Sequence, residues 1–342
     1  MNRKSIKLRG NLINSSVMPD HGDFVISPKF GKVKLVELID QGGEGRIFET
    51  DTGHAVKIYF SDKLTSRKYQ KLKQMVDKAI NIKGICWPIS LIYSEKGSFV
   101  GYLMPKANGK PMQKCMFVPP LIAKYFPHWN RKHLVQLAIT WLEKVVFLHR
   151  QGVIIGDINP LNFLLESENS IYFVDTDSYQ FDDFPCPVGT INFTAPEIQG
   201  SNFSTFLRTN NHENFAVATL IFMILMPGKT PYSHIGGESP KDNIIKGVFS
   251  YPLGERSNKK TPNGPWRFIW SHFPYRVKKA FFECFNENKR LSSSDWLLLM
   301  RQYKYALDEN HLDPEGESEK ILPKRHKLIS EYAKDKFNAG EE

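Results

Sequence analysis

The residues whose types and spacing suggest chemistry begin with a cluster of glycines and a lysine. Gly42, Gly43 and Gly45 follow a segment of alternating apolar and polar residues that is typical of a strand, and Lys57 comes on a later strand. Because glycine has no Cβ atom, the backbone amides of such a turn can approach phosphate groups closely. The pattern indicates a phosphate-binding segment, although the glycines alone are equally compatible with a plain hairpin.

Two polar segments with oxygen-bearing side chains follow much later in the chain. Asp157 and Asn162 belong to the segment GDINPLN, which comes after a long amphipathic stretch, and Asp175 follows a short apolar strand. Asp and Asn beside a Pro are common in turns, and either segment in isolation is best explained as a turn. Taken with Lys57, however, their carboxylate and carboxamide oxygens are hard ligands that suit magnesium and not zinc.

A fourth signal is Gly189-Thr190, which is followed by Ala195-Pro196-Glu197. In order and spacing, the four signals resemble a eukaryotic-type protein kinase domain that covers about residues 33 to 303. The segments DINP, VDTDSYQ and CPVGT are also similar to a bacterial subgroup of these kinases, often associated with a von Willebrand-type protein and a metal-dependent phosphatase. The cysteine-rich tail of some subgroup members has no counterpart in this sequence.

The resemblance implies a catalytic role for four positions. Lys57 would hold the α- and β-phosphates of ATP, Asp175 would ligate one magnesium ion and Asn162 a second, with Mn²⁺ as an alternative metal. Asp157 would accept the proton of the substrate hydroxyl and orient its oxygen. The cofactor-binding residues implied in addition lie in the loop and the hinge: Gly42, Gly43, Gly45, Met104 and Lys106.

Further positions are assigned to the substrate platform and to the fold. Thr190 lies where Ser/Thr kinases place a threonine that bonds near the catalytic aspartate, which favours serine and threonine as acceptors. Glu197 is expected to pair with Arg290, as the glutamate of the A-P-E element does in kinases. Glu213 occupies the place of an aspartate that tethers the catalytic loop, and its longer side chain leaves that tether open.

Several positions depart from the kinase pattern. The helix after the lysine strand normally supplies a glutamate for this lysine, but only Asp62 and Asp77 are available, and Asp77 is predicted as the partner. Asp177 takes the place of the D-F-G glycine. We predict a solvated or helix-capping role for it, with a metal contact as the less favoured alternative. The remaining departures are Asp40, Ile155, Gly156 and Asn159.

The apolar pattern predicts the elements that position these residues. Residues 33–60 and the strands Ile89–Ser94 and Ser98–Leu103 indicate a small antiparallel sheet, and a helix follows Asp62, its predicted cap. Helices dominate later, and we predict an α+β, protein-kinase-like bilobal fold with one main helix in the N-lobe and a mostly helical C-lobe. The predicted boundaries are a lead-in at 1–32, the N-lobe at 33–104, the C-lobe with its hinge at 105–303, and a charged tail at 304–342.

Composition narrows the class of protein. Hydrophobic residues make up 41% and charged residues 24% of the chain, as in ordinary globular proteins. The net charge of +10 favours phosphorylated ligands or acidic partners. Nucleic-acid binding is disfavoured, because the basic stretch between Lys57 and Lys83 is best explained as a solvated helix face. Four scattered cysteines and a polar amino terminus predict a cytoplasmic protein, and the longest apolar run, Phe215–Met226, is too short for a membrane span.

Together these patterns predict an ATP- and Mg²⁺-dependent protein kinase that phosphorylates Ser/Thr hydroxyls on protein substrates, its own chain included. The subgroup resemblance implies a phosphatase and a von Willebrand-type protein as partners. The alternative is a pseudokinase, a nucleotide-binding scaffold or regulatory module, which the missing glutamate and altered glycines favour. A small-molecule kinase is disfavoured by the A-P-E element and Gly189-Thr190, which build a platform for protein substrates.

Overall fold

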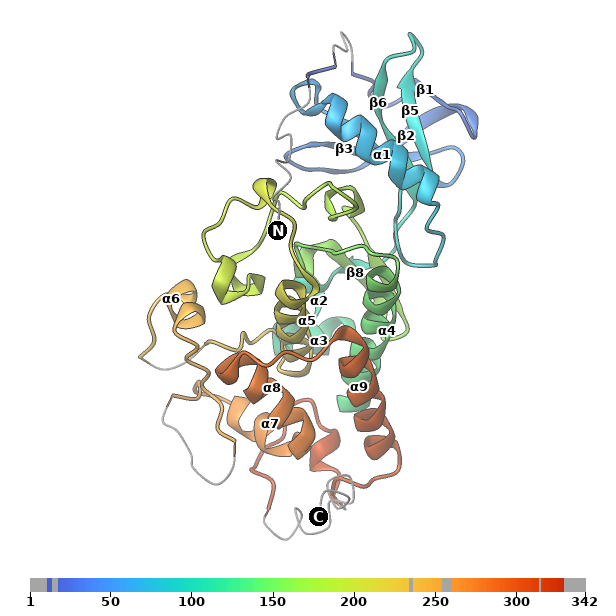
Figure 1. Cartoon of the computed structure of the whole chain (residues 1–342). Coiled ribbons are helices and arrows are strands. Elements are labelled where there is room, and N and C mark those ends of the chain that lie inside the picture. Colours follow the sequence, from blue (N-terminus) through green and yellow to red (C-terminus); the bar gives the residue numbers. More distant parts are fainter. Residues whose placement is uncertain (1–10, 14–17, 234–235, 254–259, 314, 329–342) are drawn as a thin grey trace. The chain divides into compact units, whose positions relative to one another are not determined.

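The chain forms two compact units in the computed structural model, which describes residues 11–13, 18–233, 236–253, 260–313 and 315–328. Unit 1 comprises Met1–Gly109, Tyr172–Pro187 and Phe203–Leu207, and unit 2 comprises Lys110–Ile171, Val188–Asn202 and Arg208–Glu342. Unit 1 is rich in strands and unit 2 is rich in helices (Figure 1). The final part of the predicted charged tail, residues 329–342, lies outside the described residues.

Unit 1 contains an antiparallel sheet of six strands: β1 (Phe24–Ser27), β2 (Gly31–Gln41), β3 (Gly45–Thr50), β4 (His54–Tyr59), β5 (Ser90–Ser94) and β6 (Phe99–Pro105). Their order is β1-β2-β3-β4-β6-β5, and β1 also pairs with β5, so that the sheet closes on itself as a barrel. The predicted antiparallel sheet is therefore present. The sequence interpretation missed its closure, and it missed β1, which lies in the segment assigned to the lead-in.

The core of unit 1 is built from alternate residues of these strands, because successive side chains of a strand point to opposite faces. The packed apolar side chains come from all six strands: Val25, Val33, Leu35, Phe48, Val56, Ile58, Ile92, Val100 and Leu103. Two register shifts interrupt the pairing of β2 with β3, between Leu35 and Glu37 and between Leu38 and Asp40. Such irregularities increase the local twist and help a short sheet to close.

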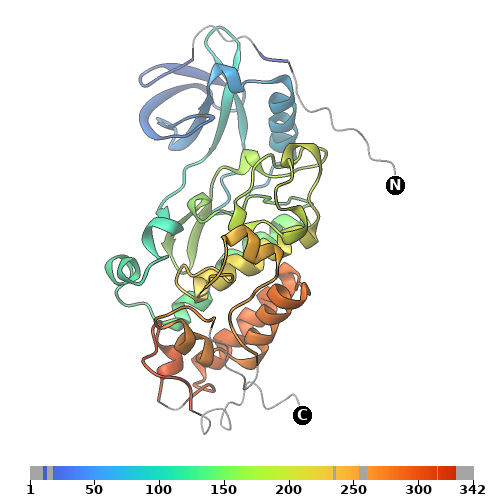
Figure 2. The same ribbon diagram turned by 90° about the vertical axis from the view of Figure 1, so that its left-hand side faces the viewer.

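The long helix of unit 1 is α1 (Ser66–Lys78), which buries Leu72 and Met75. Figures 1 and 2 show this helix lying against the strands. The Thr65 hydroxyl accepts a hydrogen bond from the Lys68 amide at 3.1 Å and so caps the helix. The predicted cap was wrong, since Asp62 lies in the preceding 3-10 turn η1 (Ser61–Lys63).

Unit 2 is mostly helical. Its helices are α2 (Met112–Cys115), α3 (Pro119–Tyr125), α4 (Arg131–Arg150), α5 (Asn210–Leu225), α6 (Pro240–Ile245), α7 (Trp266–His272), α8 (Tyr275–Glu287) and α9 (Ser293–Asp308). In Figure 1, α4 and α9 run side by side. The side chains of α5 are buried from Glu213 to Leu225, so the apolar run that begins at Phe215 belongs to a buried helix. None of the described helices is both long and apolar enough to cross a bilayer.

Unit 2 also contributes to a short sheet of β7 (Lys110–Pro111), β8 (Phe163–Ser167) and β9 (Ser170–Phe173). In the sequence, β8 and β9 lie between the two polar segments that contain Asn162 and Asp175. The 3-10 turn η2 (Pro160–Asn162) leads into β8, and the 3-10 turn η3 (Thr176–Ser178) follows β9. The short apolar strand that the sequence predicted before Asp175 is therefore present as β9. Asn162 lies immediately before β8 and Asp175 shortly after β9.

Candidate functional site

The glycine-rich segment is the tight turn between β2 and β3. The Gly42 amide donates a hydrogen bond to the Gly45 carbonyl at 3.0 Å. Packing requires glycine at position 45, because a Cβ there would lie 2.2 Å from the carbonyl oxygen of Ile58. A Cβ at Gly42 or Gly43 would meet no atom within 4 Å. Packing therefore does not explain these two glycines, and the space beside their backbone is open.

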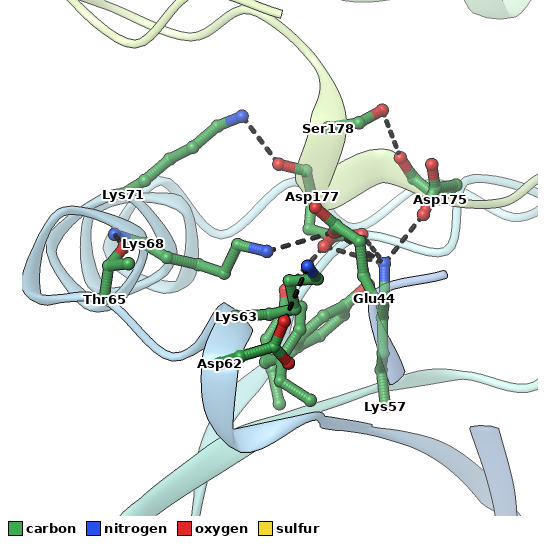
Figure 3. A network of polar contacts seen from close by, with 12 residues as sticks. Glu44, Lys57, Asp62, Lys63, Thr65, Lys68, Lys71, Asp175, Asp177 and Ser178 are labelled. Carbon is green, nitrogen blue, oxygen red and sulfur yellow. Dashed lines mark hydrogen bonds and ion pairs between the residues drawn. The ribbon is translucent and has the colours of Figure 1, made fainter. Parts of the chain in front are cut away.

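Lys57 is a buried cation of unit 1, and carboxylates surround its ammonium group (Figure 3). Its Nζ atom donates to Asp175 Oδ1 at 2.7 Å and lies 2.9 Å from both carboxylate oxygens of Asp177. A third carboxylate, that of Glu44 in the glycine-rich turn, is 3.8 Å away. The Asp177 side chain is 2% exposed and that of Asp175 is 41% exposed. The lysine thus has one buried carboxylate partner and one accessible partner.

Two tyrosine hydroxyls complete the surroundings of Asp177. The Tyr59 hydroxyl donates to Asp177 Oδ2 at 2.5 Å, and the Tyr102 hydroxyl donates to Asp177 Oδ1 at 2.7 Å. With Lys57, each carboxylate oxygen of Asp177 has two donors, so this buried charge is paired and hydrogen-bonded as burial demands. The cluster can hold the lysine ammonium at a fixed point.

The charges of this cluster shift one another's pKa values. Burial by itself would lower the pKa of Lys57, but Asp177 and Asp175 hold it well above its usual value. Burial would raise the pKa of Asp177, yet Lys57 and the hydrogen bond from Tyr59 keep it below its usual value. Burial and the charge of Asp177 raise the pKa of Asp175. Lys57 and Asp177 are therefore charged throughout the neutral range.

Two sequence interpretations fail at this cluster. Asp77, the predicted partner of Lys57, is exposed on α1, and the carboxylates within 4 Å of the lysine are those of Asp175, Asp177 and Glu44. Asp177 is neither solvated nor a helix cap, because it is buried against the lysine and two tyrosines. The cause is the turn after β9, which directs the side chain inward.

The backbone that carries Asp175 is fixed to the rest of unit 1. Phe173 exchanges hydrogen bonds with the segment before Cys86: its amide donates to the Gly84 carbonyl at 2.7 Å, and its carbonyl accepts from the Cys86 amide at 3.0 Å. Asp175 adopts a left-handed conformation with φ of 57°, which costs energy for a residue with a side chain. The Thr176 hydroxyl then donates to the Cys86 carbonyl at 2.7 Å. Both flanks of Asp175 are anchored.

The two predicted hinge residues have different surroundings. Met104 is buried in β6, where it pairs with Ala55 of β4. Lys106 lies just beyond β6 and forms an ion pair with Glu49 at 2.6 Å. Their assignment to nucleotide binding stays a prediction.

Asp157 and Thr190 meet in unit 2. The Thr190 hydroxyl donates to Asp157 Oδ1 at 2.9 Å, and the side-chain amide of Asn159 donates to the Thr190 hydroxyl at 3.4 Å. Burial raises the pKa of Asp157 above its usual value. A carboxylate with a raised pKa is a better proton acceptor, which suits a general base.

Glu213 fixes the backbone immediately before Asp157. Its carboxylate oxygens accept hydrogen bonds from the amides of Ile155 and Gly156, each at 2.7 Å, and Oε1 lies 3.1 Å from His149 Nε2. The question that the longer side chain left open is thereby answered: this glutamate tethers the loop. Its place in the first turn of the buried helix α5 makes the anchor rigid.

Glu197 and Arg290 form the predicted pair. Arg290 Nη1 donates to Glu197 Oε1 at 2.7 Å, and Nη2 donates to Oε2 at 2.8 Å. This two-bond geometry is the strongest form of the interaction.

Asn162 ends η2, where its backbone amide donates to the Asn159 carbonyl at 2.8 Å. Its role as a metal ligand stays a prediction.

The sequence interpretation missed Tyr59 and Tyr102, which complete the Lys57 cluster. A signal for both was present. Tyr59 is two residues beyond Lys57 and therefore shares its face of β4, and Tyr102 pairs directly with Lys57 across the neighbouring strand. Two tyrosines on the same face as a buried lysine indicate that an acidic partner lies close by.

Comparisons with known proteins point to the same type of domain as the sequence motifs. The chain is 28% identical over 264 residues to a protein named protein kinase YegI of Escherichia coli strain K12, and equally to its counterpart in Escherichia coli O157:H7. The alignments cover 73% of this chain, and it spans only about two fifths (41%) of the length of these relatives. No family model matches the chain. The similarity supports a protein-kinase-like domain.

Proposed function

We propose that this chain is an ATP- and magnesium-dependent protein kinase that phosphorylates serine and threonine hydroxyls. The observation that carries the proposal is the environment of Asp157. Its carboxylate is positioned by the Thr190 hydroxyl at 2.9 Å, its pKa is raised by burial, and Glu213 fixes the preceding backbone. A fixed carboxylate with a raised pKa is suited to take a proton from an incoming hydroxyl.

The other roles follow the same chemistry. Lys57 offers a charged ammonium for the α- and β-phosphates, and Asp175 and Asn162 offer hard oxygen atoms of the kind that bind magnesium. Asp175 fits this role because 41% of its side chain remains exposed although it contacts Lys57. Bound magnesium would neutralise charge on the β- and γ-phosphates. Gly42 and Gly43 leave the backbone of their turn open to phosphate oxygens.

The acceptor hydroxyls belong to serine or threonine in this proposal. Support comes from Thr190 and Asn159, which form a short chain of hydrogen bonds to Asp157. The acceptors include residues of the chain itself. The proposal extends to a cytoplasmic location and to partners of the kind that the subgroup resemblance implies, a phosphatase and a von Willebrand-type protein.

A second candidate function is a pseudokinase, and one observation favours it. Lys57 is already paired with Asp175 at 2.7 Å. Phosphate and metal would have to separate this ion pair before the two residues could take their assigned roles. A chain in which the pair persists would bind nucleotide weakly or serve as a scaffold.

The test is transfer of the labelled γ-phosphate from ATP in the presence of magnesium, to the chain itself and to a generic basic protein. Wild type is compared with Asp157→Ala and Asp175→Ala, and Asp77→Ala serves as the control because that acid is exposed on α1. Hydrolysis of the labelled product and separation of the phosphoamino acids identify the acceptor.

Transfer to serine or threonine that is lost in both site variants and kept in the control supports the proposal. Transfer confined to tyrosine would overturn the choice of acceptor. Absence of transfer by wild type, with nucleotide binding still detected as a thermal shift, would establish the pseudokinase instead.

A further inference from the structure

We propose that Asp177 is the positioning residue for Lys57, and that it takes the place of the helix glutamate that serves this lysine in kinases of the usual pattern. The inference rests on the proposed function and deepens it. In this chain α1 carries a single acidic residue, Asp77, which is exposed. The buried acid comes instead from η3, after Asp175.

Strand register makes the donors of Asp177 converge. Lys57 and Tyr59 are two residues apart in β4, so their side chains point to the same face of the sheet. Tyr102 is the direct partner of Lys57 in β6. The three side chains thus form a ready-made set of donors on one face of the sheet. Lys57 and the hydroxyls of both tyrosines end within 2.9 Å of the Asp177 carboxylate.

The main chain of Asp177 is held from α1. Lys71, which is buried, donates from Nζ to the Asp177 carbonyl at 2.6 Å (Figure 3). One turn earlier, Lys68 pairs with Glu44 at 3.0 Å and lies over the ring of Tyr59. Where the usual pattern has an acid on this helix, α1 thus presents two lysines. The reversal of charge on the helix matches the presence of the acid in the facing segment.

This arrangement divides the work between two carboxylates. Asp177 is buried and accepts four hydrogen bonds, two from Lys57 and one from each tyrosine. Asp175 is accessible and contacts Lys57 through one oxygen. If Asp175 bound a metal ion instead, Lys57 would keep a charged partner in Asp177. Asp177 would then hold Lys57 in place for the phosphates.

A double-mutant cycle tests the inference. Lys57→Met, Asp177→Asn and the double variant are compared with wild type for kcat/KM of γ-phosphate transfer and for the Kd of ATP with magnesium. If Asp177 acts through Lys57, Asp177→Asn lowers kcat/KM about 100-fold, the effect of misplacing a catalytic group by about 1 Å. The same change costs nothing further once Lys57 is absent. Thermal unfolding of each variant checks that it is folded.

Tyr102→Phe keeps the measurement informative if Asp177→Asn fails to fold. It removes one donor to Asp177 and retains the shape of the ring. We expect a smaller loss, about 10-fold, again absent in the Lys57→Met background. Asp77→Asn is the matched control and leaves both constants unchanged.

A rescue experiment moves the acid to the helix. Asp177→Gly installs the usual glycine and removes the carboxylate, and Lys68→Glu then places an acid on the face of α1 that contacts Glu44 and Tyr59. The double variant is expected to regain at least part of the kcat/KM that Asp177→Gly loses, and no gain would count against the inference.

Additive losses in the cycle, or an Asp177→Asn variant indistinguishable from Asp77→Asn, would overturn the inference even if the chain is a kinase. If wild type binds ATP without transferring phosphate, the proposed function fails. The Kd values still decide whether Asp177 positions Lys57, so the two failures are distinguishable.

Discussion

The two units hold their important carboxylates by different means. In unit 1, Asp177 is buried against a lysine ammonium and two tyrosine hydroxyls, so the cluster depends on a fully formed charge pair. In unit 2, Glu213 accepts two backbone amides and Asp157 accepts one threonine hydroxyl. Unit 1 therefore couples its chemistry to its stability through a buried ion pair, whereas Asp157 in unit 2 is held by Thr190 and by the charge of Arg208.

The largest expected effect is the loss of phosphate transfer when Asp157 in unit 2 is replaced. Asp157→Asn keeps the shape of the side chain and removes the proton acceptor, so kcat should fall roughly 10²- to 10⁴-fold. Thermal unfolding should change little, since asparagine can still accept the hydrogen bond from the Thr190 hydroxyl. Initial rates of transfer measured beside the melting curve check both parts. A large fall in melting temperature would show that Asp157 is part of the scaffold.

In unit 1, replacement of Lys57 should lower the free energy of unfolding. Lys57→Met leaves Asp177 buried without its counter-charge, which costs about 3–5 kcal/mol. Urea unfolding of wild type and variant measures the loss. Lys32→Met is the control, because Lys32 pairs with Glu95 at the surface and both side chains are more than half exposed. Equal losses in the two variants would contradict the structural role of the pair.

Glu213→Gln should have an intermediate effect. The amide oxygen of glutamine can serve one of the amides of Ile155 and Gly156, and the other is left facing an NH₂ group. An unsatisfied buried donor costs about 1–3 kcal/mol. Urea unfolding and kcat should decline together, because the loop before Asp157 loosens. Glu143→Gln, at an exposed ion pair with Arg301, should change neither.

The smallest expected effect is a pH dependence in unit 1. Burial lowers the pKa of Lys71 to about 8, against the opposing influence of Cys186, Asp177 and Glu44, while Lys68 acts in the same direction as burial. Above that pKa the folded chain has lost a proton that the unfolded chain retains, so this group makes stability rise with pH. Between pH 8 and 9 wild type should gain up to about 1 kcal/mol relative to Lys71→Met. Urea unfolding at both pH values measures this difference, and a stability difference that stays constant or shifts in favour of Lys71→Met would contradict the lowered pKa of Lys71.

The sequence predicted best the contacts that join two recognised motifs. Glu197 and Arg290 pair as expected, and Thr190 contacts Asp157. These contacts depend on the order of segments and on side-chain type. The catalytic role of Asp157 stays a prediction, which rests on its spacing to Asn162 and to the later elements.

Prediction failed where an outcome depends on which way a backbone turns. Asp177 was expected to be solvated or to cap a helix, but the left-handed conformation of Asp175 and the anchored hydroxyl of Thr176 direct its side chain inward. Asp77 was chosen by position along the helix, and only the packing of α1 shows that it faces away from Lys57. The closure of the sheet was equally hidden, because it requires β1 to pair with β5, a strand more than sixty residues away in the sequence.

The central claim is tested most directly by the magnesium dependence of γ-phosphate transfer in wild type and in Asp175→Asn. The account predicts transfer by wild type that requires magnesium. The variant should transfer at a reduced rate and need more magnesium to reach half of its maximal rate, because a neutral carboxamide replaces a charged carboxylate ligand. Transfer that is absent in wild type at every magnesium concentration, or a magnesium requirement that Asp175→Asn leaves unchanged, would contradict the account.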